Sequence, residues 1–238
     1  MRAAVLSGFL LLCTQGAMAQ ELGLFEGQSD IGAVAPPGTA AYENGTYAIT
    51  SAGTNVWARV DAFHYLWKKM SGDAVLTADV TFPPAANSHK PAEHRKGMLM
   101  FRQTLDPGGQ QVSIHVHGIG MTALQHRERR GANTQSIEIN IDKLPNTVRL
   151  EKRGDVFTMF LAQKGEPLHR VGASLKLHFA EPFYVGLGVT SHDADTTDKV
   201  IFRNVKLDSL PPASPPPDLV LNSTLGSCRS RMRPAAPP

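Results

Sequence analysis

The stretch Ala74-Val75-Leu76-Thr77-Ala78-Asp79-Val80-Thr81-Phe82 decides the fold class, because its side chains alternate between apolar and polar. Leu76, Ala78, Val80 and Phe82 fall on one face of an extended chain, and the polar residues fall on the other. Pro83-Pro84 follows directly, and proline cannot extend a hydrogen-bonded ladder. The stretch therefore predicts a half-buried β-strand that ends at Phe82.

The same strand signals recur along the chain. Ser136 to Ile141 alternates with the same period, and Val112–Val116, Gly118-Ile119-Gly120 and Met121–Gln125 together read as a hairpin. No segment holds a helical period for three turns, and glycine, proline and asparagine separate the apolar runs. This pattern predicts an all-β chain, a β-sandwich with mostly antiparallel strands. The other predicted strands are Thr147–Lys152, Val156–Ala162, Leu175–Phe179, Phe183–Thr190 and Lys199–Leu207.

Length and composition favour one globular domain. The chain has 238 residues, of which 42% are hydrophobic and 19% charged, and this balance is unlike that of a disordered chain. No apolar run reaches the ~20 residues that a membrane-spanning helix requires. The composition therefore excludes a multi-span membrane protein, and no transmembrane segment is expected.

The two ends predict export and a flexible tail. Arg2, the apolar run from Ala3 to Cys13 and Ala17-Met18-Ala19 are typical of a cleaved signal peptide over residues 1–19. The sequence from Pro211 onward is rich in proline and arginine, which predicts a disordered tail over residues 211–238. The predicted folded domain therefore spans residues 20–210 of a periplasmic or extracellular protein.

The charge of the predicted domain is balanced. The 24 Lys and Arg residues include Arg2 and three arginines of the tail, and the 21 Asp and Glu residues include Asp218 of the tail. The domain between them consequently carries as many basic as acidic residues. Because nucleic-acid binding needs a concentrated basic face, we expect no nucleic-acid partner.

Several short pieces, spread from about Leu24 to Leu207, carry a resemblance to a known family. They are Asp30-Ile31-Gly32, Thr54-Asn55-Val56-Trp57, Asp61-Ala62-Phe63-His64, Ser71-Gly72-Asp73, Leu99-Met100-Phe101-Arg102, His117-Gly118-Ile119-Gly120, Leu124-Gln125-His126-Arg127, Glu151-Lys152-Arg153-Gly154, Val185-Gly186-Leu187-Gly188, Ser191-His192-Asp193 and Phe202-Arg203-Asn204-Val205. In combination they resemble secreted bacterial domains with a concanavalin A-like, or laminin G-like, jelly-roll fold. Relatives of that family are often associated with periplasmic proteins of the Tol biopolymer-transport type.

The resemblance implies two stacked antiparallel sheets, one convex and one concave, and a periplasmic protein partner as one expectation. It implies little about activity, because the family is largely uncharacterised. Ile119 stands where relatives often carry an acid, and Asn55 stands where an aspartate is frequent. Both departures weaken any proposal of acidic metal ligands at those positions.

A non-catalytic binding site for polysaccharide or glycoconjugate is the first functional hypothesis, and it rests on analogy with the fold. Trp57 follows a turn and is the candidate to stack on a sugar ring. We expect His64, Arg102 and Arg127 to bond hydroxyls or an acidic group from the concave face. For the two arginines the alternative is a structural pair with Asp61 or Asp73. Phe63, Tyr65 and Trp67 share one strand face, and an aromatic stripe of this kind usually belongs to a core.

His192 is the fifth candidate ligand-binding residue, in a predicted loop that also holds Asp193, Asp195 and Asp198. Carboxylates in a loop can hold Ca²⁺, but the spacing fits no EF-hand, so no cofactor is expected and Ca²⁺ remains an alternative. His115, His117 and His126 could bind Zn²⁺ or Cu²⁺ if they shared one face of the hairpin. A slip of one residue in register would separate them.

Two other functional classes stay open. A hydrolase or lyase acting on polysaccharide would need paired carboxylates, and Glu138, Asn140 and Asp142 share one strand face. An envelope protein-interaction module would instead use an exposed strand edge. No nucleophile elbow and no phosphate-binding glycine loop occurs in the sequence.

Overall fold

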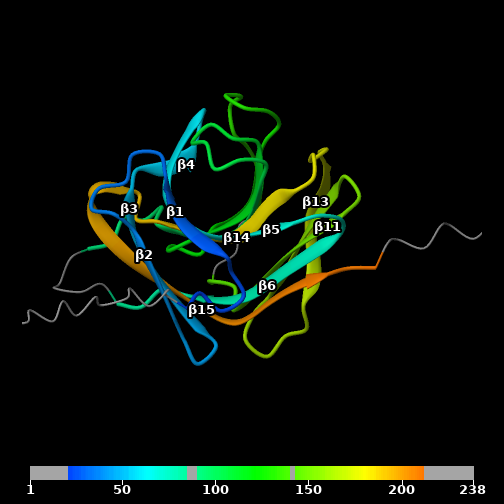
Figure 1. Cartoon of the computed structure of the whole chain (residues 1–238). Helices are drawn as coiled ribbons and strands as arrows, with labels where there is room; N and C mark the ends of the chain where they lie inside the picture. Colours follow the sequence, from blue (N-terminus) through cyan, green and yellow to red (C-terminus); the bar gives the residue numbers. More distant parts are fainter. Residues whose placement is uncertain (1–20, 85–89, 140–142, 212–238) are drawn as a thin grey trace, which may run out of the picture.

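The computed structural model describes residues 21–84, 90–139 and 143–211. The predicted signal peptide and nearly all of the predicted tail lie outside the described residues, as do Asn140 and Asp142. Within the described ranges the chain forms fifteen strands and no helix. The all-β prediction is confirmed, and the strands are arranged in two layers (Figure 1).

In the described part of the chain, the first layer is an eight-stranded antiparallel sheet. Its strands follow the order β1-β5-β14-β7-β8-β9-β10, and β4 pairs with β5 beside this path. The bounds are β1 (Gly27–Ile31), β4 (Asn55–Trp57), β5 (Val60–Met70), β7 (Lys96–Arg102), β8 (Gln111–His117), β9 (Thr122–Arg127), β10 (Gln135–Ile139) and β14 (Phe183–Thr190).

The second layer, again counted over the described residues, is a seven-stranded antiparallel sheet in the order β13-β12-β11-β6-β15-β3-β2. In Figure 1, β6 and β15 run below β5 and β14 of the first sheet. The bounds are β2 (Thr39–Glu43), β3 (Thr46–Gly53), β6 (Ala74–Thr81), β11 (Thr147–Arg153), β12 (Val156–Ala162), β13 (His169–Lys176) and β15 (Asp193–Ser209).

The main core lies between the two sheets. Residues that pair across neighbouring strands of the first sheet form a row of apolar side chains. This row lies on the inner face of the sheet, which is the face toward the second sheet. The row runs through Leu66, Leu187, Leu99, Ile114 and Leu124. Because side chains alternate along each strand, the residues between these positions point to the outer face.

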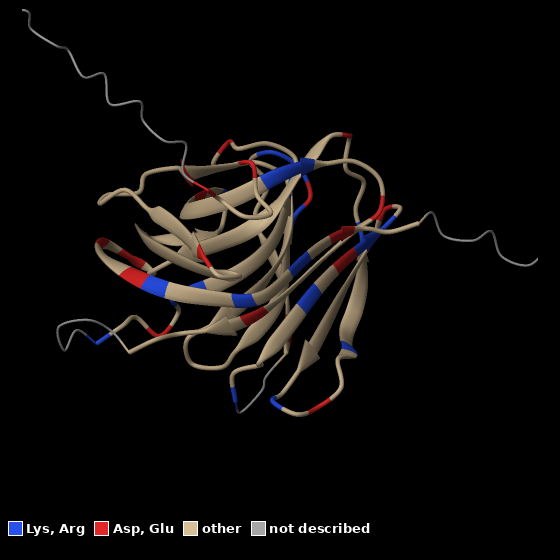
Figure 2. Cartoon of the chain, turned by 60° about the horizontal axis from the view of Figure 1, so that its bottom comes forward, with Lys and Arg blue, Asp and Glu red and all other residues tan. Residues whose placement is uncertain are grey.

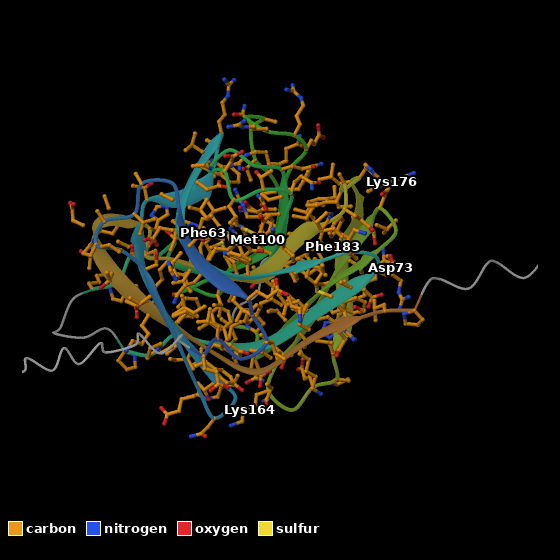
Figure 3. All side chains as sticks on the ribbon, in the orientation of Figure 1. Phe63, Asp73, Met100, Lys164, Lys176 and Phe183 are labelled. Atoms are coloured by element: carbon orange, nitrogen blue, oxygen red, sulfur yellow. The ribbon has the colours of Figure 1, made fainter. Side chains whose placement is uncertain are left out.

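The outer face of the first sheet carries a second apolar cluster, built around Phe63, Tyr65, Met98 and Met100. All four side chains are buried, and Figure 3 shows Phe63 and Met100 within the space that the ribbon encloses in Figure 1. The opening in the ribbon is therefore filled with side chains over much of its area. The expectation that the aromatic stripe belongs to a core is confirmed for Phe63 and Tyr65.

Two predicted strand boundaries are wrong. Only Leu175 and Lys176 of the predicted strand Leu175–Phe179 lie in a strand, β13, which begins earlier, at His169, and ends at Lys176. Phe179 instead leaves the sheet and packs on Phe157 in the main core. The predicted acidic loop from Asp193 to Asp198 belongs to β15, whose pairing with β3 shifts register there. The sequence from Asp193 to Asp198 does not alternate between apolar and polar residues, and alternation alone therefore predicts no strand there. A β-bulge adds unpaired residues to a strand without ending it, so these polar residues can still belong to β15.

Gly186 in β14 allows this strand to lie close to β5. A Cβ atom on Gly186 would lie 1.9 Å from the carbonyl oxygen of Leu66. We expect Gly186→Ala to lower the free energy of unfolding by about 1–3 kcal/mol, because the paired strands β14 and β5 must move apart. Urea denaturation at constant slope measures the change. An unchanged midpoint would contradict the close approach.

Charged residues of both signs are interspersed along the strands (Figure 2). This distribution agrees with the balanced count for the predicted domain. Over the described residues, no helix is long and apolar enough to cross a membrane.

Candidate functional site

A cavity of about 210 Å³ opens on the outer face of the first sheet, and we call it the Trp57 pocket. It combines an exposed aromatic ring with several buried polar side chains, whereas the other cavities described have no aromatic lining residue. Five strands and three connections contribute to it. Its lining residues are Asn55, Trp57, His94, Lys96, His117, Met121, Gln125, Glu138 and His192.

Lys96 begins β7 at one end of the Trp57 pocket and is only 3% exposed. Its ammonium group donates to the side-chain oxygen Oδ1 of Asn55 at 2.8 Å and to the backbone oxygen of His94 at 2.9 Å. Burial lowers the pKa of Lys96 to about 7, because desolvation penalises the charged amine. Lys96 is not among the residues that the sequence predicts for the site.

The amide of Asn55 links Lys96 to His192. Its oxygen Oδ1 accepts from Lys96 and from the backbone N–H of Val56, so its nitrogen Nδ2 must face Nε2 of His192, 3.2 Å away. Nδ2 can only donate, and Nε2 of His192 is therefore the acceptor. Burial, followed by the nearby charge of Lys96, lowers the pKa of His192. His192 thus contributes a neutral ring to the pocket.

The backbone at His192 is unusual, with φ of 61° in a residue other than glycine. Such conformations are uncommon and tend to occur at functional sites. The ring of His192 lies 5.4 Å from that of His94, measured between centroids. The structure therefore brings two predicted residues, His192 and Trp57, into one pocket.

His117 presents a hydrogen-bond acceptor to the pocket. Its Nδ1 lies 3.0 Å from the backbone oxygen of Met121, and because a carbonyl only accepts, Nδ1 carries the proton. Nε2 then keeps its lone pair. Burial is the largest cause that lowers the pKa of His117 to about 3, and Lys96 adds to it. The ring is therefore neutral at physiological pH.

Gln125 and Glu138 form the other side of the Trp57 pocket. Gln125 is 3% exposed, and its oxygen Oε1 is buried without a hydrogen-bond partner in the described structure. Ala123, the cross-strand partner of Glu138, has a small side chain and leaves room above β9. A buried unpaired amide oxygen is costly, and a ligand hydroxyl could satisfy it.

Trp57 is 42% exposed at the end of β4. The turn that follows it is held in place through the backbone oxygen of Ala58. That oxygen accepts from the backbone N–H of Thr134 at 2.8 Å, from its hydroxyl at 3.0 Å and from Nη2 of Arg127 at 3.2 Å. The ring is thus presented by an anchored turn, as a stacking platform requires.

Arg102 and Arg127 do not line the pocket, which differs from the ligand-binding role expected for them. Both are fully buried on the outer face and share one counter-ion, Asp61. Arg127 binds the carboxylate with two nitrogens, at 2.6 and 2.8 Å, and Nη1 of Arg102 lies 2.7 Å from Oδ2. The alternative of a structural pair with Asp61 is what the structure shows.

The remaining guanidinium N–H groups of this buried triad hold three loops on the sheet. Arg102 donates to the backbone oxygens of Thr104 and Asp106. Arg127 donates to several further carbonyl oxygens, which belong to Ala58, Pro107, Gly109 and Ala132. Arg127 acts on the pocket indirectly, because it anchors the turn that carries Trp57, whereas Arg102 holds the loop after β7.

His64 also lies away from the pocket, on the inner face of β5. It is 3% exposed, and its ring nitrogens lie 2.7 Å from Oδ1 of Asp30 and 2.9 Å from Oε1 of Gln28. Both ring nitrogens are therefore engaged within the fold. The four residues Trp57, His64, Arg102 and Arg127 do not point into one concavity.

The predicted histidine metal set is not assembled. His115 and His117 share the outer face as expected, but His126 pairs with Val112 and points to the inner face. Asp198 of the acidic segment forms an ion pair with Arg95. No group of three or more His, Cys, Asp or Glu within residues 21–84, 90–139 and 143–211 is arranged to hold a metal ion.

Comparisons with known proteins give no match to any protein-family model and none to a curated protein. Among solved structures, a functionally unknown protein from Saccharomyces cerevisiae is 12% identical with a TM-score of 0.56, over 73% of this chain and 92% of that chain. The carbohydrate-binding module CBM66 from Bacillus subtilis is 19% identical with a TM-score of 0.50, over 78% of this chain and 98% of that chain.

A prokaryotic β-1,3-1,4-glucanase (lichenase) from a mouse hindgut metagenome is 11% identical with a TM-score of 0.45, over 72% of this chain and 83% of that chain. The likeness to the yeast protein and to CBM66 bears on the fold and not on function. The membership of the Tol-associated family stays a prediction. The two antiparallel sheets have the concanavalin A-like jelly-roll fold that the resemblance implied.

Proposed function

We propose that this chain is an exported, periplasmic or extracellular carbohydrate-binding domain without catalytic activity, and that its binding site is the Trp57 pocket. The observation that carries the proposal is the combination of the exposed Trp57 ring with a preformed set of buried polar groups. Aromatic faces pack on the C–H faces of sugars, and fixed donors and acceptors select hydroxyls.

The polar groups suit a sugar because they include both donors and acceptors. Lys96 donates, Nε2 of His117 accepts, and the amide of Gln125 can do both. A sugar hydroxyl donates one hydrogen bond and accepts others, so a ring with several hydroxyls can satisfy all three groups. The jelly-roll likeness to a carbohydrate-binding module supports this assignment only at the level of the fold.

The size of the pocket limits what it takes. About 210 Å³ is below the range of about 300–1,000 Å³ that is usual for small-molecule pockets. We infer that the pocket holds one sugar unit of a longer glycan. The rest of the glycan would lie along the surface beside Trp57.

Trp57→Ala is expected to weaken glycan binding at least tenfold, because it removes the stacking face, and such a loss corresponds to about 1.4 kcal/mol. A glycan array identifies a binding glycan, and titration calorimetry then compares the variants. Val156→Ala is the matched control, since Val156 is 40% exposed in the second sheet. Equal affinity of the Trp57 variant and the wild type would place the site elsewhere.

The enzymatic alternative is separated by a second assay on the same glycan. Glu138 lines the pocket, while its expected partner Asp142 lies outside the described residues. Release of reducing or unsaturated sugar ends by the wild type, abolished by Glu138→Gln, would replace the binding proposal with a hydrolase or lyase. Binding without product supports a non-catalytic domain.

A further inference from the structure

Lys96 has no counter-ion among the described residues of its pocket. Of the ion pairs found within the described ranges, none joins Lys96 to a carboxylate. The hydrogen bonds of its ammonium group go to two uncharged oxygens. Buried charges in proteins are normally paired, because an unpaired buried charge lowers the stability of the fold. A neutral hydrogen-bond donor at this position, such as a glutamine side chain, would avoid that loss of stability.

Apart from Lys96, the titratable groups at this end of the pocket are imidazoles, and burial lowers the pKa values of His115, His117 and His192. His94 precedes β7, His115 and His117 lie on the adjacent β8, and His192 follows β14. The acid of the pocket is Glu138, on β10. Because β7 and β10 are three strand spacings of about 4.8 Å apart, their backbones are separated by about 14 Å. The pocket thus has a basic end and an acidic end.

The geometry at Lys96 leaves one direction open. A tetrahedral ammonium group has three N–H bonds, and two of them are used by Oδ1 of Asn55 and by the backbone oxygen of His94. The third has no acceptor among the described residues, and Lys96 lines the cavity. Gln125, with its unpaired buried Oε1, faces the same cavity and needs a donor such as a hydroxyl.

We propose that the Trp57 pocket selects an acidic sugar, a uronic acid unit whose carboxylate binds the Lys96 ammonium group and whose hydroxyls face Gln125 and Glu138. This inference rests on the proposed function, and it names the class of glycan. The ligand carboxylate supplies the missing counter-ion in a charge-assisted hydrogen bond. Repulsion by Glu138 fixes the orientation, because it keeps the carboxylate at the basic end.

The test compares acidic sugars with their neutral counterparts. The probes are trisaccharides in matched pairs, namely glucuronate with glucose, galacturonate with galactose, and mannuronate with mannose, together with acetate. We expect at least one acidic sugar to bind tenfold or more tightly than its neutral partner, and Lys96→Met to abolish the difference. Lys164→Met is the control, since Lys164 is exposed and lies far from Phe63 and Met100 in Figure 3.

A pH series provides a readout that a structural role of Lys96 would not give. The carboxylate binds the protonated amine, whose pKa in the free protein is about 7. Preference for the acidic sugar should therefore fall up to about tenfold per pH unit above pH 7. His117 and His192 are uncharged there because burial lowers their pKa values. Neutral-sugar binding should not change, and circular dichroism verifies that each variant is folded.

The outcomes separate this inference from the proposed function. If a neutral sugar binds in a Trp57-dependent manner and no acidic sugar exceeds its partner, the acidic preference is wrong and the binding domain stands. If no sugar binds, both are wrong. If acetate binds as tightly as the best uronate, the site recognises a carboxylate without a sugar, and the inference is overturned.

Discussion

An Asp61→Asn variant is expected to lose about 3–5 kcal/mol of unfolding free energy, because it leaves two buried guanidinium groups without a counter-charge. Asp61, Arg102 and Arg127 are each 1% exposed or less. Water cannot replace the lost carboxylate without opening the loops that cover the triad. Urea denaturation of both proteins, with the same slope, measures the difference.

The control for this prediction is Asp155→Asn. Asp155 pairs with His178 at 2.9 Å, but the two side chains are 39% and 77% exposed. Exposed pairs contribute little, so this variant should change stability by less than about 0.5 kcal/mol. If Asp61→Asn behaved like the control, the triad would not hold the loops, and the anchoring of Trp57 through Ala58 would need another explanation.

Lys96→Met is expected to stabilise the protein at pH 7 by about 2 kcal/mol. Burial lowers the pKa of Lys96 from 10.5 to about 7, which costs the wild type roughly 4 kcal/mol of unfolding free energy at this pH. Replacing the amine by the uncharged methionine removes this cost. The two lost hydrogen bonds cost about 1 kcal/mol each. Functional sites often contain residues that lower the stability of the fold. A binding role for Lys96 therefore predicts that its replacement stabilises the protein.

The pH dependence of this difference has a definite sign. Between pH 7 and 10.5 the unfolded state binds more protons at Lys96 than the folded state, so wild-type stability rises with pH relative to Lys96→Met. The advantage of the variant should shrink by up to about 1.4 kcal/mol per pH unit over this window. Urea denaturation of both proteins at pH 7 and 9 measures it. A constant difference would contradict a lowered pKa.

The fold could be predicted well because its signals are local. Alternation places Phe63 and Tyr65 on one face of β5 and His64 on the other, and pairing with neighbouring strands preserves that assignment. The alternation of side chains along a strand does not show which face of the sheet will be covered by loops. The outer face looked like an open concave surface, but it holds a second apolar cluster and a buried ion triad.

The candidate site could be predicted only in pieces, because its contacts are distant in sequence. Asp61 lies 41 residues from Arg102 and 66 from Arg127, so nothing near either arginine reveals its partner. Lys96 was missed because its partner Asn55 is 41 residues away. A lysine at the start of the apolar run Gly97–Phe101 is the one local signal of its burial.

Other members of the pocket were singled out for different reasons. Trp57 and His192 are predicted ligand-binding residues, whereas His117 belongs only to the metal-binding alternative and Glu138 only to the hydrolase or lyase alternative. The structure brings these four together in one cavity. Sequence patterns therefore recognised residues with unusual chemistry, while only the register between strands could show that they meet.

The most direct measurement is an NMR titration of the two tryptophan indole N–H signals with a glycan that binds. The chain has two tryptophans, and Trp67 donates its indole N–H to Ser29 beside Tyr184 on the outer face. We expect the Trp57 signal to shift and saturate with the binding curve while the Trp67 signal stays in place. A saturating shift of Trp67 without one of Trp57 would contradict the Trp57 pocket as the binding site.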